Sequence, residues 1–237
     1  HYVPHFDRDA GGRCTFTYIK LFLRLGLRVI FVGDNYFPHQ PYTSELEQLG
    51  VEVLYGSWYQ GHFAEWLKDY GKYIDYAYLN RPHIACKYID LFRRHSAAKI
   101  IYFGHDLHFL REMRQYELEK NPALLAEANR SKEQEMRLFR EADVVHVVGS
   151  YEEGYLRELL PEKPIRNIPL YVYTDAELER RERSCAGTAD LLFVGGFGHQ
   201  PNADGVLWFV QEIWPTIVAA LPQIRLTIVG SNAPPAI

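Results

Sequence analysis

A buried strand, a glycine-rich turn and the start of a helix follow one another in Leu191-Leu192-Phe193-Val194-Gly195-Gly196-Phe197-Gly198-His199-Gln200-Pro201-Asn202. A comparable turn, Asp9-Ala10-Gly11-Gly12-Arg13, comes near the other end of the chain. Glycine permits positive φ angles and lets a ligand approach the backbone, and the first amides of the following helix attract anions. The two turns predict two nucleotide-type α/β units facing a common cleft, in which a group is transferred.

The composition is that of an ordinary globular protein. Of the 237 residues, 47% are apolar and 24% charged, so a sizeable core can be buried. The net charge of −4 provides no overall positive field, and we expect no nucleic-acid partner. The three widely spaced cysteines, Cys14, Cys86 and Cys185, predict a reducing cytoplasm rather than a disulfide framework. No apolar run approaches the roughly 20 residues of a membrane span.

Short apolar runs alternate with longer helical patterns along most of the chain. The tail of a first strand is expected at Tyr2-Val3-Pro4-His5, and a capping box at Ser44 and Glu47. Further strands are predicted at 29–33, 51–54, 73–79, 99–103 and 143–148. The helices between and after them are predicted at 15–25, 44–50, 82–95, 107–141 with a break at Asn121-Pro122, and 152–160. This order predicts a parallel sheet with both faces covered.

The pattern weakens after residue 165 and resumes at residue 190. We therefore predict an N-terminal Rossmann-like domain at 1–170, a linker at 171–189 and the beginning of a second domain at 190–237. The second domain is expected to hold a strand at 190–195, a helix at 202–220 and a strand at 224–229. A helix and two strands are too little for an independent core, so we expect more protein to follow Ile237. The missing initiator Met also suggests a fragment.

Polar residues follow several predicted strands, at the sheet edge where open α/β sheets bind ligands. His105-Asp106-Leu107-His108 follows the strand at 99–103, and Asn80-Arg81 follows the strand at 73–79. An imidazole here can bind a phosphate or a sugar hydroxyl, with Asp106 orienting it. Arg81, and Arg111 further along, can supply positive charge. Ser150, Glu152 and Glu153 follow the strand at 143–148.

Each of these motifs also has a purely structural interpretation. Asp106 could cap the helix that starts at Leu107, Ser150 could cap the next helix, and both arginines could form surface ion pairs. Asp7-Arg8-Asp9 resembles an Asp-x-Asp metal motif, but a solvated loop or a helix cap is favoured, with Asp9 still able to face the cleft. His105 and His108 have no third ligand at convincing spacing, so we expect no bound metal.

Together these features resemble the GT-B glycosyltransferases, in particular the retaining enzymes of family 4 in variants used for bacterial polysaccharide or O-antigen assembly. The matching parts are the Gly11-Gly12 loop, the His105-Asp106 strand end, the strand from Ala142 to Ser150 and the start of a second domain at Phe193-Val194-Gly195. The resemblance implies that the first domain binds a saccharide or lipid-linked acceptor and the second a nucleotide-sugar donor. It also implies no cofactor and a cytoplasmic location, with peripheral association at the inner membrane face.

The resemblance implies roles for individual residues. His105 and Asp106 would be catalytic, with His105 contacting the transferred sugar. The donor phosphates would lie against Gly11, Gly12, Gly196, Gly198, His199 and Asn202. The acceptor or the cleft would be lined by Asp9, Arg81, His108, Arg111, Ser150 and Glu153.

Two departures from the family pattern concern the second turn. Gly196 stands where Arg is usual, and His199, Gln200 and Asn202 surround the position of a missing Lys. The Glu pair that grips the donor would lie beyond Ile237, so we expect the isolated 237 residues to be inactive. A non-catalytic binding or scaffold module and a sugar-nucleotide epimerase are alternatives. An NAD-linked oxidoreductase is disfavoured by the incomplete dinucleotide fingerprint.

Overall fold

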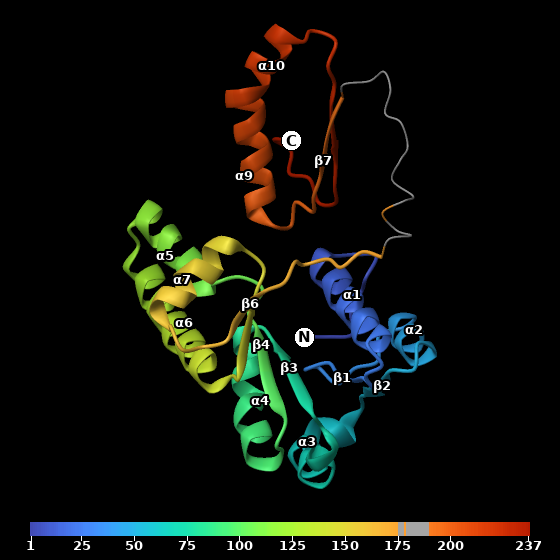
Figure 1. Cartoon of the computed structure of the whole chain (residues 1–237). Helices are drawn as coiled ribbons and strands as arrows, with labels where there is room; N and C mark the ends of the chain where they lie inside the picture. The colour runs from blue at the N-terminus through green and yellow to red at the C-terminus, as the bar shows by residue number, and fades with distance from the viewer. Residues whose placement is uncertain (175–177, 179–189) are drawn as a thin grey trace. The chain divides into compact units, whose positions relative to one another are not determined.

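A computed structural model describes residues 1–174, 178 and 190–237, with the elements labelled in Figure 1. The chain divides into two compact units, His1–Tyr173 and Thr174–Ile237. All the strands described are paired in parallel and alternate with helices, which confirms the predicted α/β class. Most of the predicted linker at 171–189 lies outside the described residues. No helix in the described ranges is long and apolar enough to cross a membrane.

The first unit holds its strands in two parallel sheets. The strands are β1 (Ile30–Val32), β2 (Glu52–Leu54), β3 (Tyr76–Asn80), β4 (Lys99–Phe103), β5 (Val144–Val147) and β6 (Ile165–Asn167). β1 pairs with β2, and the other four form a sheet in the order β3-β4-β5-β6. The predicted strand at Tyr2–His5 is wrong: this segment is irregular, and Asn35 donates a backbone hydrogen bond to His1 at 3.0 Å. Pro4 has no N–H to contribute to a ladder.

Helices connect these strands and cover their faces. They are α1 (Ala10–Arg24), α2 (Tyr42–Gln48), α3 (Ser57–Tyr70), the 3-10 turn η1 (Gly71–Tyr73), α4 (Pro82–His95), α5 (His108–Glu119), α6 (Pro122–Glu141) and α7 (Ser150–Leu159). The predicted break at Asn121-Pro122 is confirmed, because Asn121 caps α6 by accepting from the Ala123 amide at 3.0 Å. The predicted capping box is wrong, because α2 begins before Ser44. α3 had not been predicted.

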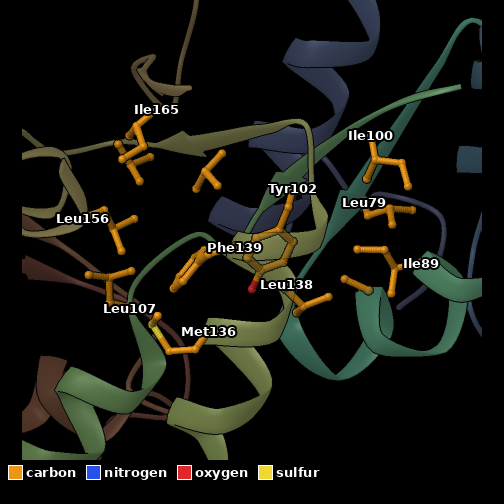
Figure 2. Close-up of a cluster of buried hydrophobic side chains, with 14 of the residues drawn as sticks. Leu79, Ile89, Ile100, Tyr102, Leu107, Met136, Leu138, Phe139, Leu156 and Ile165 are labelled. Carbon is orange, nitrogen blue, oxygen red and sulfur yellow. The ribbon is translucent and has the colours of Figure 1, made fainter. Parts of the chain in front are cut away.

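The two faces of the four-stranded sheet bury different residues. On one face, apolar side chains from β3 to β6 pack against α4, α6 and α7, and Figure 2 shows Tyr102 and Phe139 in the middle of this cluster. On the other face, Tyr18 and Cys14 of α1 pack on Tyr78 and Phe103. Helices α1 and α6 accordingly lie on opposite sides of the sheet in Figure 1. Successive side chains of each strand point to opposite faces of the sheet, because side-chain direction in a strand repeats every two residues.

Residues 190–237 of the second unit form one parallel strand pair and the helical segment between its strands. Its elements are β7 (Leu191–Val194), α9 (Gln200–Trp208), the π-helical segment η2 (Phe209–Ile213), α10 (Trp214–Ala220) and β8 (Leu226–Val229). Phe197 is buried against Ala203 and Val206 of α9. The predicted single helix at 202–220 is thus three segments, and Pro215 lies at the start of the last.

Candidate functional site

The carboxyl ends of β3 and β4 carry two residues with unusual backbone conformation. Arg81 has a φ of 64° and His105 a φ of 75°. Both values lie in the left-handed region that side-chain-bearing residues rarely adopt, at a cost of about 1–3 kcal/mol each. Such strain is concentrated at functional sites. Adjacent strands therefore end in two strained polar residues at the sheet edge where the sequence predicted ligand binding.

A small pocket opens at the ends of β4 and β5. Its enclosed volume is about 10 Å³, far below the roughly 300–1,000 Å³ of pockets that hold a drug-sized ligand. The pocket in this structure has room for about one water-sized group and not for a sugar ring. It is lined by Gly104, His105, Asp106, Leu107, Phe139, His146, Val147 and Glu152.

His105 is the half-buried imidazole of this pocket. Its ring lies 4.1 Å from the ring of Phe103, measured between centroids. Burial, followed by the positive charge of Arg81, lowers the pKa of His105 to about 3. The imidazole is therefore neutral near pH 7, and it can offer one hydrogen-bond donor and one acceptor.

His146 packs on Phe103, the ring against which His105 lies. It is 2% exposed and stacks on Phe103 with ring centroids 4.0 Å apart. Its Nε2 donates to the Ile168 carbonyl at 2.9 Å, so Nδ1 accepts from the Tyr78 hydroxyl. Burial lowers the pKa of His146. The sequence prediction missed this residue, although a histidine flanked by Val145 and Val147 in an apolar strand was a usable signal.

Asp106 and its neighbours form an ion-paired cluster at the pocket rim. Asp106 pairs with Arg111, and its Oδ1 lies 3.1 Å from His108 Nδ1. Burial opposes protonation of His108, but a hydrogen bond to Glu135 and the charges of Asp106 and Glu135 raise its pKa overall. The proposed ion pair for Arg111 is thus present. In this structure Arg111 and His108 both interact with the carboxylate of Asp106.

Glu135 caps helix α5, a role that the sequence analysis considered for Asp106. It lies on α6 with 0% exposure, and its carboxylate accepts from the Phe109 amide at 2.9 Å and the His108 amide at 3.3 Å. Leu107, the N-cap residue, has only a hydrocarbon side chain. The capping hypothesis for Asp106 is wrong because the carboxylate of Glu135, which is 26 residues beyond its partner Phe109, occupies the position.

Glu152, rather than Glu153, lines the pocket. Both are in the first turn of α7, but Glu153 points into an ion pair with Arg157 at 2.6 Å. Burial, and secondarily the charge of Asp106, raise the pKa of Glu152, while backbone groups of Val148 and Leu107 counteract them. Ser150 is exposed and does not cap the helix, because Gly149 occupies the N-cap position.

Arg81 and the start of α1 form a second, positively charged part of the site. The Arg81 Nη2 lies 3.2 Å from the point where a Cβ on Gly11 would be. In the described ranges 1–174 and 190–237, its guanidinium has neither an ion pair nor a hydrogen bond, contrary to the alternative that it forms a surface ion pair. Arg81 is thus available to an anion.

Gly11 and Gly12 lie in the first turn of α1 and not in a loop before it. Asp9 is the N-cap residue, and its Oδ1 accepts from the Gly12 amide at 2.6 Å. A Cβ on Gly12 would lie 2.8 Å from the carbonyl oxygen of His5. The group that packs closely against Gly12 is therefore the backbone of His5 and not a ligand. Gly11 lies beside the Arg81 guanidinium.

The Asp7-Arg8-Asp9 triplet is used structurally. Asp7 accepts from the Tyr42 hydroxyl at 2.6 Å, and Asp9 caps α1 as the helix-cap alternative expected. Among the described residues no group of three or more His, Cys, Asp or Glu side chains is placed to bind a metal ion.

The turn in the second unit is held by Asn202, whose Nδ2 donates to the Gly196 carbonyl at 2.9 Å. A Cβ on Gly196 or Gly198 would meet only ordinary contacts, at 3.7 Å and 3.8 Å, so packing does not demand glycine at these two positions. His199 is the exposed N-cap residue of α9. Asn202 therefore shapes the turn, while Gly196, Gly198 and His199 surround its open side.

The low pKa of His105 predicts a measurable loss of stability in acid. A histidine with a pKa of about 6.5 when unfolded and about 3 when folded stabilises the protein above its unfolded pKa, and this contribution is lost as the pH falls. Between pH 7.5 and 5.5 the loss is about 1.4 kcal/mol. His105→Asn, which tolerates positive φ, should remove this part of the pH dependence in urea unfolding.

His108→Asn is the matched control, because the pKa of His108 is raised. A raised pKa contributes stability that is lost as the pH increases, so this variant should steepen the acid loss instead. Identical pH profiles for wild type and His105→Asn would show that His105 is not held neutral by burial.

The scan against known protein families matches none of them, and the search of curated proteins finds no significant match.

Proposed function

We propose that this chain belongs to a glycosyltransferase that moves a sugar from a nucleotide-sugar donor to a saccharide or lipid-linked acceptor, with retention at the anomeric carbon. The observation that carries the proposal is the position of His105. Its imidazole is neutral, its backbone has a strained positive φ, and it lines the same pocket as Asp106 and Glu152, within the field of the unpaired Arg81.

This arrangement suits the separation of a sugar from a diphosphate. An available guanidinium beside the N-terminus of α1 can stabilise the negative charge of a leaving phosphate. A neutral imidazole and carboxylates can hold sugar hydroxyls without a competing charge on the ring nitrogen. In the second unit, the open side of the Gly196–Gly198 turn is the proposed place for donor phosphates, although its neighbourhood at 195–202 contains no Arg or Lys.

Binding of nucleotide sugars by the gene product that contains this chain tests the proposal. We expect UDP-, GDP- or dTDP-sugars to raise its melting temperature and an acceptor-dependent transfer to follow. Stabilisation by NAD alone would overturn the proposal. No response to any nucleotide would favour a non-catalytic scaffold, and isomerisation of the donor sugar without an acceptor would identify an epimerase.

His105→Ala should lower kcat/KM for sugar transfer by about 100- to 1,000-fold, the usual effect of removing one group that stabilises the transition state. Transfer of labelled sugar measures the effect, and circular dichroism checks that the fold is kept. His62→Ala is the control, because His62 is exposed on α3, where it stacks on Trp58 and its Nδ1 lies 2.9 Å from the Trp58 carbonyl oxygen. Equal activity of the two variants would remove His105 from the mechanism.

A further inference from the structure

The chain leaves the four-stranded sheet through an irregular segment at Ile168–Tyr171, which we call the exit segment. It follows the edge strand β6 and leads to the second unit, which begins at Thr174. In Figure 1 it runs from the end of β6 toward the start of α1. Ile168 and Leu170 are each 37% exposed, so these side chains bury little apolar surface. Apolar burial therefore attaches the exit segment only weakly to the first unit.

Two buried polar side chains bind successive carbonyl groups of the exit segment. His146 of β5 donates from Nε2 to the Ile168 carbonyl at 2.9 Å. The Tyr18 hydroxyl of α1 donates to the Pro169 carbonyl at 2.5 Å. Both side chains are enclosed by the protein, with exposed fractions of 2% for His146 and 4% for Tyr18. These two hydrogen bonds therefore join the exit segment to the sheet and to α1.

The exit segment explains why polar side chains occupy these two buried positions. A hydroxyl or an imidazole that is buried without a hydrogen bond costs free energy, whereas an apolar side chain in the same place does not. The Nδ1 of His146 accepts from the Tyr78 hydroxyl, so both of its ring nitrogens are used when Ile168 is in place. The hydrogen bonds of this buried cluster are thus complete with the exit segment bound.

The end of the exit segment lies over a buried thiol. Cys14 is 1% exposed and belongs to the cluster of Tyr18 and Phe103, against which Tyr171 packs. The Tyr171 hydroxyl lies 3.4 Å from the carbonyl oxygen of Ala10, one helical turn before Cys14 in α1. Moving Tyr171 away would uncover this side of the cluster. The accessibility of the Cys14 thiol therefore reports whether the exit segment is bound.

We propose that Tyr18 and His146 form a latch for the exit segment, and that the latch opens locally while the sheet stays folded. A segment held by a few hydrogen bonds and little apolar surface opens at a lower free energy than the strands beside it. With the latch closed, the connection to the second unit starts after Tyr171. With the latch open, it starts at the end of β6 and is longer. This device is independent of the proposed sugar transfer.

Labelling of Cys14 with N-ethylmaleimide tests the latch in the gene product that contains this chain. Trypsin cleaves after Arg13 and Lys20, so the mass of the peptide 14–20 reports this thiol separately from the other cysteines. When labelling is slower than reclosing, its rate is proportional to the population of the open state. Tyr18→Phe removes the bond to Pro169 and keeps the ring. We expect it to speed labelling roughly three- to tenfold, the usual net effect of one hydrogen bond.

Tyr155→Phe is the matched control, because Tyr155 packs in the cluster on the other face of the sheet and should leave the labelling rate unchanged. Urea distinguishes local opening from unfolding. Below the unfolding transition, the labelling rate of wild type and of Tyr18→Phe should stay nearly constant, since a local opening exposes little surface. The latch is rejected if Tyr18→Phe labels no faster than Tyr155→Phe. It is also rejected if urea accelerates labelling of the wild type as steeply as it promotes global unfolding.

Discussion

Gly12→Ala should destabilise the first unit by about 2 kcal/mol. The added Cβ would lie 2.8 Å from the carbonyl oxygen of His5 and 2.9 Å from its carbonyl carbon and its amide nitrogen. These are backbone atoms, so the segment before α1 must shift, and such overpacking costs about 1–3 kcal/mol. The better helix propensity of alanine offsets only part of this cost. For a protein of this size, the melting temperature should fall by about 4–8 °C.

Gly11→Ala is the matched control in the same helical turn. Its Cβ would meet only side-chain atoms, the Arg81 Nη2 at 3.2 Å and the Asp9 Oδ1 at 3.4 Å. The guanidinium can move, so we expect a stability within about 0.5 kcal/mol of wild type or slightly above it. If both variants unfold at the same temperature, the N-terminal segment does not pack against α1 as described.

Three strands of the larger sheet, β3, β4 and β5, were predictable because each is an apolar run bounded by turn residues, whereas β6 (Ile165–Asn167) was missed because only its first residue is apolar. Lys99–Phe103 is such a run, ending at Gly104, and the strand occupies those five residues. Tyr2–His5 has the same appearance, but Pro4 removes a ladder donor and the segment stays irregular. Helix α3 was missed because its buried side chains are largely aromatic, which are typical of strands.

Strand-end reasoning found part of the candidate site and misassigned the rest. It located His105, Asp106 and Arg81 at one sheet edge, because parallel strands end together there. It selected Glu153 instead of Glu152, because successive helical residues differ by about 100° in direction and the sequence does not give the rotation of α7. Glu135 could not be found, because its partners are 26 and 27 residues away on another helix.

Glu135→Ala should have the largest effect on stability, about 3–5 kcal/mol. The side chain is fully buried and accepts hydrogen bonds from two amides at the start of α5, and its Oε1 also lies 3.6 Å from His108 Nδ1. Removing one partner of a buried charged pair leaves the other group and the amides without compensation. Urea unfolding measures the global loss, and faster hydrogen exchange of the first α5 amides should accompany it.

Two further variants distinguish the stability lost with the Glu135 cap from the stability lost by any substitution in α6. Glu133→Ala changes an exposed residue of the same helix and should stay within about 0.5 kcal/mol of wild type. Glu135→Gln keeps one acceptor oxygen but turns an amide donor toward the helix start, so we expect an intermediate loss of about 1–3 kcal/mol. The cap is essential to the site as well, because α5 begins immediately after the pocket residues Asp106 and Leu107. A Glu135→Ala protein as stable as Glu133→Ala would mean that α5 is anchored by other contacts and that His108 does not depend on this carboxylate.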